Sequence, residues 1–321
     1  MLFKTFGGVE AFPICISTQE ADMVVRLVQT IAPAFGGINL EDISSPRCFD
    51  IEQQLQECLD IPVFHDDQHG TAIVALAGLL NALKIVDRQL SEVKIVFNGA
   101  GASAIATAKL LIQAGARHLI VCDTRGAVYQ GRPHGMNKIK HQLAEFTNPE
   151  KQQGSLAEVL KGAEVFIGLS GPNVLTQEMV RAMAKDPIVF AMANPDPEIL
   201  PDEAHAAGAA VVATGRSDFP NQVNNCLAFP GIFRGALDIR AKAINDDMNI
   251  AAAHAIASLV GKDLSPGYIL PGAMDFRVPP AVAEAAARAG LKSGMARRHL
   301  EPEQVARHTR EFIYDERLSL I

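Results

Sequence analysis

The chain has 321 residues, of which 48% are hydrophobic and 20% are charged, and its formal net charge is −7. This composition is typical of a globular protein of one large or two smaller domains. The acidic balance and the lack of a long Lys/Arg block argue against a nucleic-acid partner. No apolar run reaches the roughly 18 residues of a membrane span, and the N-terminus does not resemble a signal peptide. Five scattered cysteines without C-x-x-C spacing predict reduced, buried thiols in a reducing cytoplasm.

The first ninety residues are predicted to form short strands and helices. In chain order, we expect a buried strand at 12–16, a capping box at 17–20 followed by a helix at 21–34, a strand at 38–40, a helix at 49–59, a strand at 62–64 and a helix at 70–86. The last helix is apolar on nearly all sides, which predicts that it is buried.

Beyond residue 90, short apolar strands alternate with helices, as in a parallel sheet that is covered on both faces. The predicted strands are 94–98, 118–123, 165–170, 188–193 and 210–214, with loops at 126–135 and 147–154. After Phe229 the chain is predicted to be mostly helical, most clearly at 245–260 and 279–290. The pattern predicts an α/β fold with a doubly wound parallel sheet of the Rossmann-like type.

A dinucleotide-binding fingerprint follows the strand at 94–98. Residues 99–104 read Gly-Ala-Gly-Ala-Ser-Ala, the G-x-G-x-x-A form, and open a helix. Gly99 permits the tight turn, Gly101 lets the backbone approach a pyrophosphate, and Ala104 allows the helix to pack closely on the strand. Asp123 ends the next strand, where a ribose-binding acid belongs. Arg125 fits either a cofactor 2′-phosphate or a solvated loop charge.

Two acidic pairs, Glu41-Asp42 and Asp66-Asp67, follow two neighbouring short strands. Hard cations such as Mg²⁺ and Mn²⁺ prefer oxygen ligands. Adjacent strand residues point to opposite faces, so both members of a pair converge only where the strand gives way to a loop. A single pair would be read as helix caps or solvated charges, whereas two pairs at neighbouring strand ends predict a metal site. His65 and His69 are expected to pack beside this site rather than to bind the ion.

Polar clusters follow the later strands, at the edge where open α/β sheets bind ligands. They are Ser170-Gly171-Pro172, Asn194-Pro195-Asp196-Pro197 and the amide-rich segment 215–225. Asparagine amides can donate to a substrate carboxylate or to the nicotinamide carboxamide. Asn194 before a proline is also typical of turn chemistry. Asn221, Asn224 and Asn225 together favour a binding role.

Five segments together resemble the malic enzymes in their compact prokaryotic form. They are Leu40–Ile43, Phe64–Ala72, Ala193–Pro195, Ala213–Asp218 and Phe229–Gly231. The resemblance runs from the first residues to about Ala257. It implies oxidative decarboxylation of (S)-malate to pyruvate and CO₂, with reduction of NAD or NADP and with Mg²⁺ or Mn²⁺ as the metal. It also implies residues 1–70 as the remainder of a substrate- and metal-binding lobe, and 71–321 as the NAD(P)-binding domain with C-terminal helices.

Site residues follow from the resemblance position by position. Glu41, Asp42 and Asp67 match the metal ligands, and Asp66 matches the carboxylate that orients the catalytic lysine. Asn194 and Asn225, with Asn224 beside them, match amides that contact the substrate. The cofactor-binding residues implied are Gly99, Gly101, Ala102, Ser103, Ala104, Asp123, Arg125, Ser170 and Asn194.

The catalytic lysine and tyrosine of the family match no residue here. The family lysine lies in a Gly-Lys step that would come just before Met1, and the three tyrosines, Tyr129, Tyr268 and Tyr314, occur too late in the chain. We therefore expect a chain without the N-terminal lobe, with turnover near background. The alternative is a non-catalytic NAD(P)- or metal-binding subunit. The resemblance further implies a cytoplasmic homodimer or larger homo-oligomer. It does not decide whether the cofactor is NAD or NADP.

Overall fold

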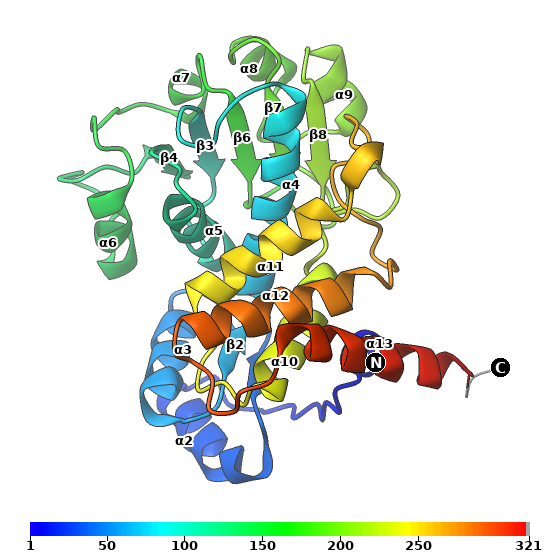
Figure 1. Ribbon diagram of the computed structural model, residues 1–321. Coiled ribbons are helices and arrows are strands. Elements are labelled where there is room, and N and C mark those ends of the chain that lie inside the picture. Colours follow the sequence, from blue (N-terminus) through cyan, green and yellow to red (C-terminus); the bar gives the residue numbers. More distant parts are fainter. Residues whose placement is uncertain (319–321) are drawn as a thin grey trace. The chain divides into compact units, whose positions relative to one another are not determined.

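The computed structural model describes residues 1–318, with the side chains of residues 1–313, so the side chain of Tyr314 lies outside the described part. The chain divides by its contacts into two compact units (Figure 1). Unit 1 comprises Met1–Ala77, Asn224–Leu259 and the chain from Pro271 onward, and unit 2 comprises Gly78–Val223 and Val260–Leu270. Among the described residues, no helix has the length and apolarity that crossing a membrane requires.

Unit 2 contains the predicted doubly wound sheet (Figure 1). Its strands are β3 (Lys94–Asn98), β4 (His118–Asp123), β5 (Gly126–Ala127), β6 (Val165–Gly168), β7 (Ile188–Ala191) and β8 (Val211–Thr214), in the spatial order β5-β4-β3-β6-β7-β8. All neighbours are parallel except β5, which pairs antiparallel with β4. The five predicted strands are confirmed. The loop expected at 126–135 instead begins with β5, because Gly126 and Ala127 pair back onto Asp123 and Cys122.

The strand order places a switch point between β3 and β6, because the chain leaves β3 toward β4 and later returns to the other side of β3 at β6. In open α/β sheets this point marks the ligand crevice at the carboxyl ends of the strands. The helices of the unit are α5 (Ala102–Gln113), α6 (Lys138–Phe146), α7 (Leu156–Val159), α8 (Gln177–Arg181) and α9 (Pro201–Ala206), and α4 (Thr71–Ile85) enters it from unit 1.

Both faces of this sheet are buried, as its two-sided apolar strands predict. On one face, Val96, Phe166 and Val189 pack with side chains of α7, α8 and α9. On the other, a Cβ atom built on Gly78 of α4 would lie 3.2 Å from the ring of Phe190, so helix and sheet approach closely there. The predicted burial of α4 is confirmed over most of its length.

Unit 1 begins with α1 (Leu2–Gly7) and contains a two-stranded parallel sheet of β1 (Ile38–Leu40) and β2 (Val63–His65). Helices α2 (Ala21–Ile31) and α3 (Arg47–Cys58) cover it, and Val24, Val28, Ile51 and Leu55 form a core with the strands. The later helices are α10 (Phe229–Asp238), α11 (Asp246–Ser258), α12 (Val278–Lys292) and α13 (Pro302–Leu318), and α12 packs against the other three. The predicted C-terminal helices are confirmed.

The expected division of the chain at residue 70 differs from the observed one. Most of the chain after Asn224 belongs to unit 1, because α10 packs against α1 and α12. The apolar C-terminal helices therefore belong to the same compact unit as the N-terminal segment.

Three local expectations for unit 1 are wrong. Residues 12–16 form neither strand nor helix, and the side chain of Phe12 is 70% exposed, because no strand pairs with this segment in the described part of the chain. The capping box does not form at α2, where Thr18 instead accepts the N–H of Glu20. Cys15 and Cys58 are exposed rather than buried.

Candidate functional site

The two acidic pairs lie at adjacent strand ends of unit 1. Leu40, the last residue of β1, is in register with His65, the last residue of β2, and the strands run parallel. Glu41 and Asp42 therefore leave the sheet beside Asp66 and Asp67. The N–H of Asp42 donates to Oδ2 of Asp67 at 3.0 Å, which joins the two loops directly. The predicted convergence of the pairs at the strand ends is confirmed.

The electrostatics of these loops favour a cation. The pKa of Glu41 is raised, first by partial burial and then by the negative charges of Asp67 and Asp42. A bound cation would offset the repulsion among the three carboxylates, and their oxygens are the donors that Mg²⁺ and Mn²⁺ prefer. No group of three or more His, Cys, Asp or Glu side chains in the described residues is gathered tightly enough to hold an ion by itself. The donor set fits a hard divalent metal by its chemistry, and the ligand assignment stays a prediction.

Asp66 begins a π-helical turn, Asp66–Gly70, which the sequence did not reveal. Its side chain is buried, and Oδ1 has no hydrogen-bond partner. The pKa of Asp66 is raised to about 8, chiefly by burial and further by the charges of Glu41 and Asp67, against an opposing effect of His69. The Nδ2 group of Asn225 donates to Oδ2. A Cβ atom on Gly70 would lie 2.1 Å from Oδ1, so any larger residue at the end of this turn would require the Asp66 side chain to move.

The fingerprint in unit 2 has the local geometry that the sequence predicted. Gly99 follows β3 with φ 121°, and a Cβ atom there would lie 2.4 Å from the carbonyl oxygen of Leu169. Gly101 is the N-cap of α5 and has open space on its Cβ side, and Ala104 is buried against the fold. Ala102 and Ser103 form the first turn of α5, where free N–H groups can meet a pyrophosphate.

Two loops at the switch point are held by buried polar contacts. Asn98, at the end of β3, donates from Nδ2 to Oγ of Ser170 at 2.6 Å. Glu198 is fully buried and accepts the N–H groups of Ser170 and Ala193, each at 3.0 Å. Ser170 and the exposed Asn194 therefore stand on loops braced by one carboxylate at the carboxyl ends of β6 and β7. Glu198 was not singled out from the sequence, where it is one acid among several in a Pro-rich loop.

The amide-rich segment divides into different roles. Asn221 is buried, donates to the carbonyls of Val212 and Pro266 and accepts the N–H of Ile269, so its amide is fully used by the fold. The binding role inferred for Asn221 is therefore wrong. Asn224 accepts the N–H of Cys226 and caps the short helix Asn225–Leu227.

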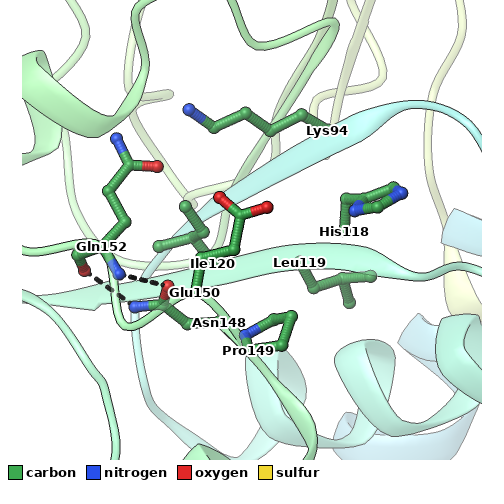
Figure 2. A pocket seen from close by; sticks show the side chains of 8 residues that line it. All are labelled: Lys94, His118, Leu119, Ile120, Asn148, Pro149, Glu150 and Gln152. Atoms are coloured by element: carbon green, nitrogen blue, oxygen red, sulfur yellow. Dashed lines mark hydrogen bonds between the residues drawn. The ribbon is translucent and has the colours of Figure 1, made fainter.

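A surface pocket lies at the opposite ends of β3 and β4 from the fingerprint (Figure 2). It is lined by Lys94, His118, Leu119, Ile120, Asn148, Pro149, Glu150 and Gln152. Asn148 and Gln152 exchange two hydrogen bonds of 2.8 Å across the turn on one side of it. None of the predicted site residues lies in this pocket. The ligand region of unit 2 is therefore expected at the switch point between β3 and β6 and not in this pocket.

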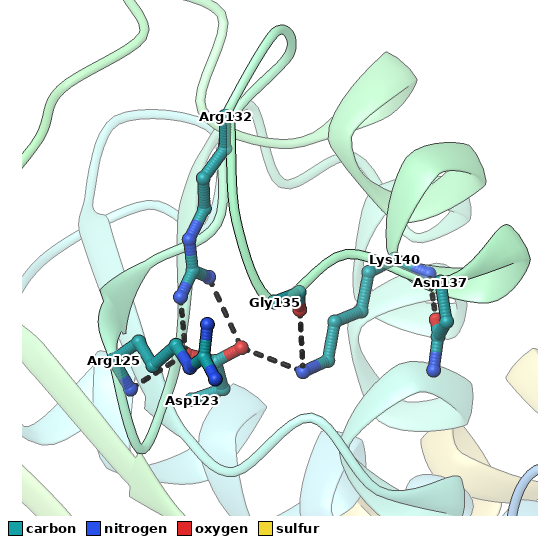
Figure 3. Close-up of polar contacts among 6 residues, drawn as sticks. All are labelled: Asp123, Arg125, Arg132, Gly135, Asn137 and Lys140. Atoms are coloured by element: carbon teal, nitrogen blue, oxygen red, sulfur yellow. Dashed lines mark hydrogen bonds and ion pairs between the residues drawn. The ribbon is translucent and has the colours of Figure 1, made fainter.

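Asp123, the predicted ribose-binding acid, is already the centre of a basic cluster (Figure 3). Arg132 donates to both carboxylate oxygens at 2.8 and 3.0 Å, Lys140 donates to Oδ2 at 2.6 Å, and the N–H of Arg125 donates to Oδ1 at 2.8 Å. Burial alone would raise the pKa of Asp123, but the hydrogen bonds from Arg132 and Lys140 outweigh it and hold the pKa at about 2. The carboxylate is thus ionised and enclosed by donors.

Comparisons with known proteins decide the family. Residues 68–289 match the model of the malic enzyme NAD-binding domain. The chain is 58% identical to the bifunctional malic/malolactic enzyme of Bacillus subtilis over 97% of its own length and 76% of that protein. It is 55% identical to the NAD-dependent malic enzyme of Geobacillus stearothermophilus over 93% and 62%. The crystal structure of malic enzyme from Pyrococcus horikoshii superposes with a TM-score of 0.95 at 48% identity, covering 98% of this chain and 75% of that one. The chain belongs to the malic enzyme family.

For this malic enzyme family member, the sequence did not reveal several residues that contact a predicted site residue or its turn. Arg132 and Lys140 fall in and after the segment predicted as a plain loop, and only their positive charge near Asp123 could have pointed to them. Glu52 lies within α3, where its pattern is that of an ordinary helical acid, yet only 6% of it is exposed.

Proposed function

We propose that this chain carries the metal-, substrate- and cofactor-binding parts of an enzyme that oxidatively decarboxylates (S)-malate to pyruvate and CO₂. The observation that carries the proposal is the hydrogen bond from the N–H of Asp42 to Asp67, which joins the two acidic loops of a malic enzyme family member. Glu41, Asp42 and Asp67 would hold Mg²⁺ or Mn²⁺. When bound, such an ion polarises the C2 oxygen of the substrate and stabilises the negative charge left by the loss of CO₂.

Asp66 and Asn225 would position the groups that move protons. With a pKa of about 8, Asp66 carries a proton at neutral pH and can give or accept a hydrogen bond at Oδ1. The resemblance assigns this atom to orienting the family's catalytic lysine, which matches no residue of this sequence. Asn225 has two amide hydrogens, one of which is used by Asp66, so the second can donate to a malate carboxylate. Asn224 and Asn194 stay candidate substrate-binding residues.

The Asp123 cluster supports NADP as the preferred cofactor. An ionised carboxylate offers about four acceptor positions, and here four donors fill them: two from Arg132, one from Lys140 and the N–H of Arg125. A ribose 2′-hydroxyl of NAD would find no open acceptor on Asp123. The negative charge of Asp123 is outnumbered by the positive charges of Arg132, Lys140 and Arg125, and this excess of positive charge suits a 2′-phosphate.

Binding and turnover of the purified chain test these proposals separately. Mn²⁺ binding can be followed by electron paramagnetic resonance, NADPH binding by nucleotide fluorescence, and turnover by CO₂ release from malate with Mn²⁺ and NADP. We expect Mn²⁺ binding that is lost in Asp67→Asn, with NADPH binding retained. A wild-type chain that binds no Mn²⁺ contradicts the proposal. Turnover near background is expected because the family lysine and tyrosine match no residue here, and CO₂ release well above background would exclude the non-catalytic alternative. We further propose a homodimer or larger oligomer, which light scattering would measure.

A second activity is suggested by the relative in Bacillus subtilis, which is named as both a malic and a malolactic enzyme and shares 58% of aligned residues. A malolactic reaction converts malate to lactate and CO₂ and returns the nicotinamide in its original oxidation state. Product analysis would distinguish the two reactions, since the oxidative one releases pyruvate with one NADPH per CO₂. Lactate without net NADPH would assign the malolactic reaction to this chain.

A further inference from the structure

The turn that carries Asp66 and Asp67 is anchored from behind by Glu52 on α3. The carboxylate of Glu52 accepts from Nε2 of Gln68 at 3.1 Å and lies 2.7 Å from Nε2 of His69, through different oxygens. Gln68 and His69 follow Asp67 directly in the turn Asp66–Gly70. One buried side chain thus contacts two consecutive residues next to the acidic pair.

The same carboxylate is tied to the strand that leads into the turn. Nε2 of Gln56, one helical turn after Glu52, lies 3.3 Å from Oε1 of Glu52 and 3.2 Å from the carbonyl oxygen of Val63 in β2. The ring of His69 also packs on the ring of Phe64 in β2, with centroids 5.3 Å apart. Helix α3, strand β2 and the turn are therefore joined by polar and aromatic contacts around Glu52.

Glu52 is an unusual residue for a buried position on the core face of α3, where an apolar side chain would be expected. Only 6% of it is exposed, and its neighbours on the core face of α3, Ile51 and Leu55, are apolar and fully buried. Burying a carboxylate costs free energy that its hydrogen bonds only offset, so apolar residues in place of both Glu52 and its buried partner Gln68 would serve stability as well. What Glu52 adds is a fixed orientation of the turn, because its two carboxylate oxygens hold the side chains of Gln68 and His69 together.

The orientation of this turn determines where the side chains of Asp66 and Asp67 point. Asp67 reaches the N–H of Asp42 at the end of β1, while Asp66 turns to Asn225. The side chains of Asp66 and Asp67 can reach these two different partners only if the backbone of the turn Asp66–Gly70 is held in one conformation. We propose that Glu52 is a positioning residue for the metal site, which sets the turn so that Asp67 faces Glu41 and Asp42. This inference rests on the proposed metal-dependent function.

Replacing Glu52 by glutamine tests the inference with little change in volume. The amide nitrogen of the variant cannot accept from Gln68, and it can donate to Nε2 of His69 only if that ring takes the other tautomer. The paired contacts to Gln68 and His69 are therefore weakened and the turn can rotate. We expect Glu52→Gln to weaken Mn²⁺ binding about 10- to 100-fold, the range typical of residues that orient metal ligands. NADPH affinity should change less than about 2-fold. Glu57→Gln is the matched control, since Glu57 is an exposed acid on the same helix.

A reciprocal exchange separates positioning from stability. Glu52→Gln combined with Gln68→Glu restores a carboxylate facing an amide, and its Mn²⁺ affinity should recover to within about 3-fold of the wild type. Gln68→Glu alone sets two carboxylates against each other and should weaken binding. The exchange variant also tests the positioning role of Glu52 if the single variant Glu52→Gln folds poorly.

Two results mark different failures. A wild-type chain that binds no Mn²⁺ removes the proposed function. A wild-type chain that binds Mn²⁺, with unchanged affinity in folded Glu52→Gln or no recovery in the exchange, overturns the role of Glu52 alone.

Discussion

Asn225 donates a hydrogen bond to the carboxylate of Asp66, although 159 residues separate them in the sequence. The contact links the short helix before α10 to the turn after β2 within unit 1. The amide of Asn225 meets Oδ2 of Asp66, and the other carboxylate oxygen, Oδ1, is buried without a hydrogen-bond partner in the part of the chain that the structure describes. A buried, incompletely satisfied acid held by one distant amide is a costly arrangement that points to a role in function.

Removing that amide should destabilise unit 1. In Asn225→Ala, Asp66 loses its partner while it remains buried, which typically costs about 1–3 kcal/mol. Urea unfolding followed by circular dichroism measures the change. The exposed residue Gln53 provides a control as Gln53→Ala, for which no more than about 0.5 kcal/mol is expected. If Asn225→Ala and Asp66→Asn have effects that simply add in the double variant, the two side chains are not coupled.

The raised pKa of Asp66 predicts a pH dependence of stability. The folded pKa of about 8 lies above the model value of 3.8, so between these values the folded state binds a proton that the unfolded state lacks. Stability from this group is complete below pH 3.8, falls as the pH rises and levels off above about 8, with a limiting slope of about 1.4 kcal/mol per pH unit. Measured in chelator, the difference in unfolding free energy between the wild type and Asp66→Asn should fall from pH 5 to pH 8. A difference in unfolding free energy that does not change with pH would contradict the raised pKa of Asp66.

The sequence predicted the elements and the residues whose role is local. The five sheet strands, the fingerprint and the two acidic strand ends follow from apolar runs and from Gly and Asp at fixed offsets, and the structure has them in place. The apolar run 12–16 forms no strand because such a run becomes a strand only when another strand pairs with it, and none does in the described part of the chain. The partners of Asp123 and Asp66 could not be predicted, because those contacts depend on where a loop and a helix return in space.

Two glycines of the fingerprint should respond oppositely to alanine. Gly99 has φ 121° and no room for a Cβ atom beside Leu169, so Gly99→Ala should lower the unfolding free energy of unit 2 by several kcal/mol. Gly101 has a negative φ and nothing within 4 Å of a built Cβ, so Gly101→Ala should fold normally. Its methyl group would instead obstruct the pyrophosphate, and NADPH binding should weaken about 10-fold or more. Normal NADPH affinity in Gly101→Ala would remove the fingerprint from the cofactor site.

The basic cluster at Asp123 should discriminate between the two nicotinamide cofactors. Lys140 donates to Asp123 and is partly exposed, so it can also meet a 2′-phosphate. A charge-assisted hydrogen bond contributes about 1.5–3 kcal/mol, so Lys140→Gln should weaken NADPH binding about 10- to 100-fold and NADH binding less than about 2-fold. Lys138→Gln, an exposed lysine at the start of the same helix, is the matched control. Fluorescence titration with both nucleotides measures the ratio. If the wild type binds NADH as tightly as NADPH, or if Lys140→Gln weakens both equally, the cluster does not select the phosphate.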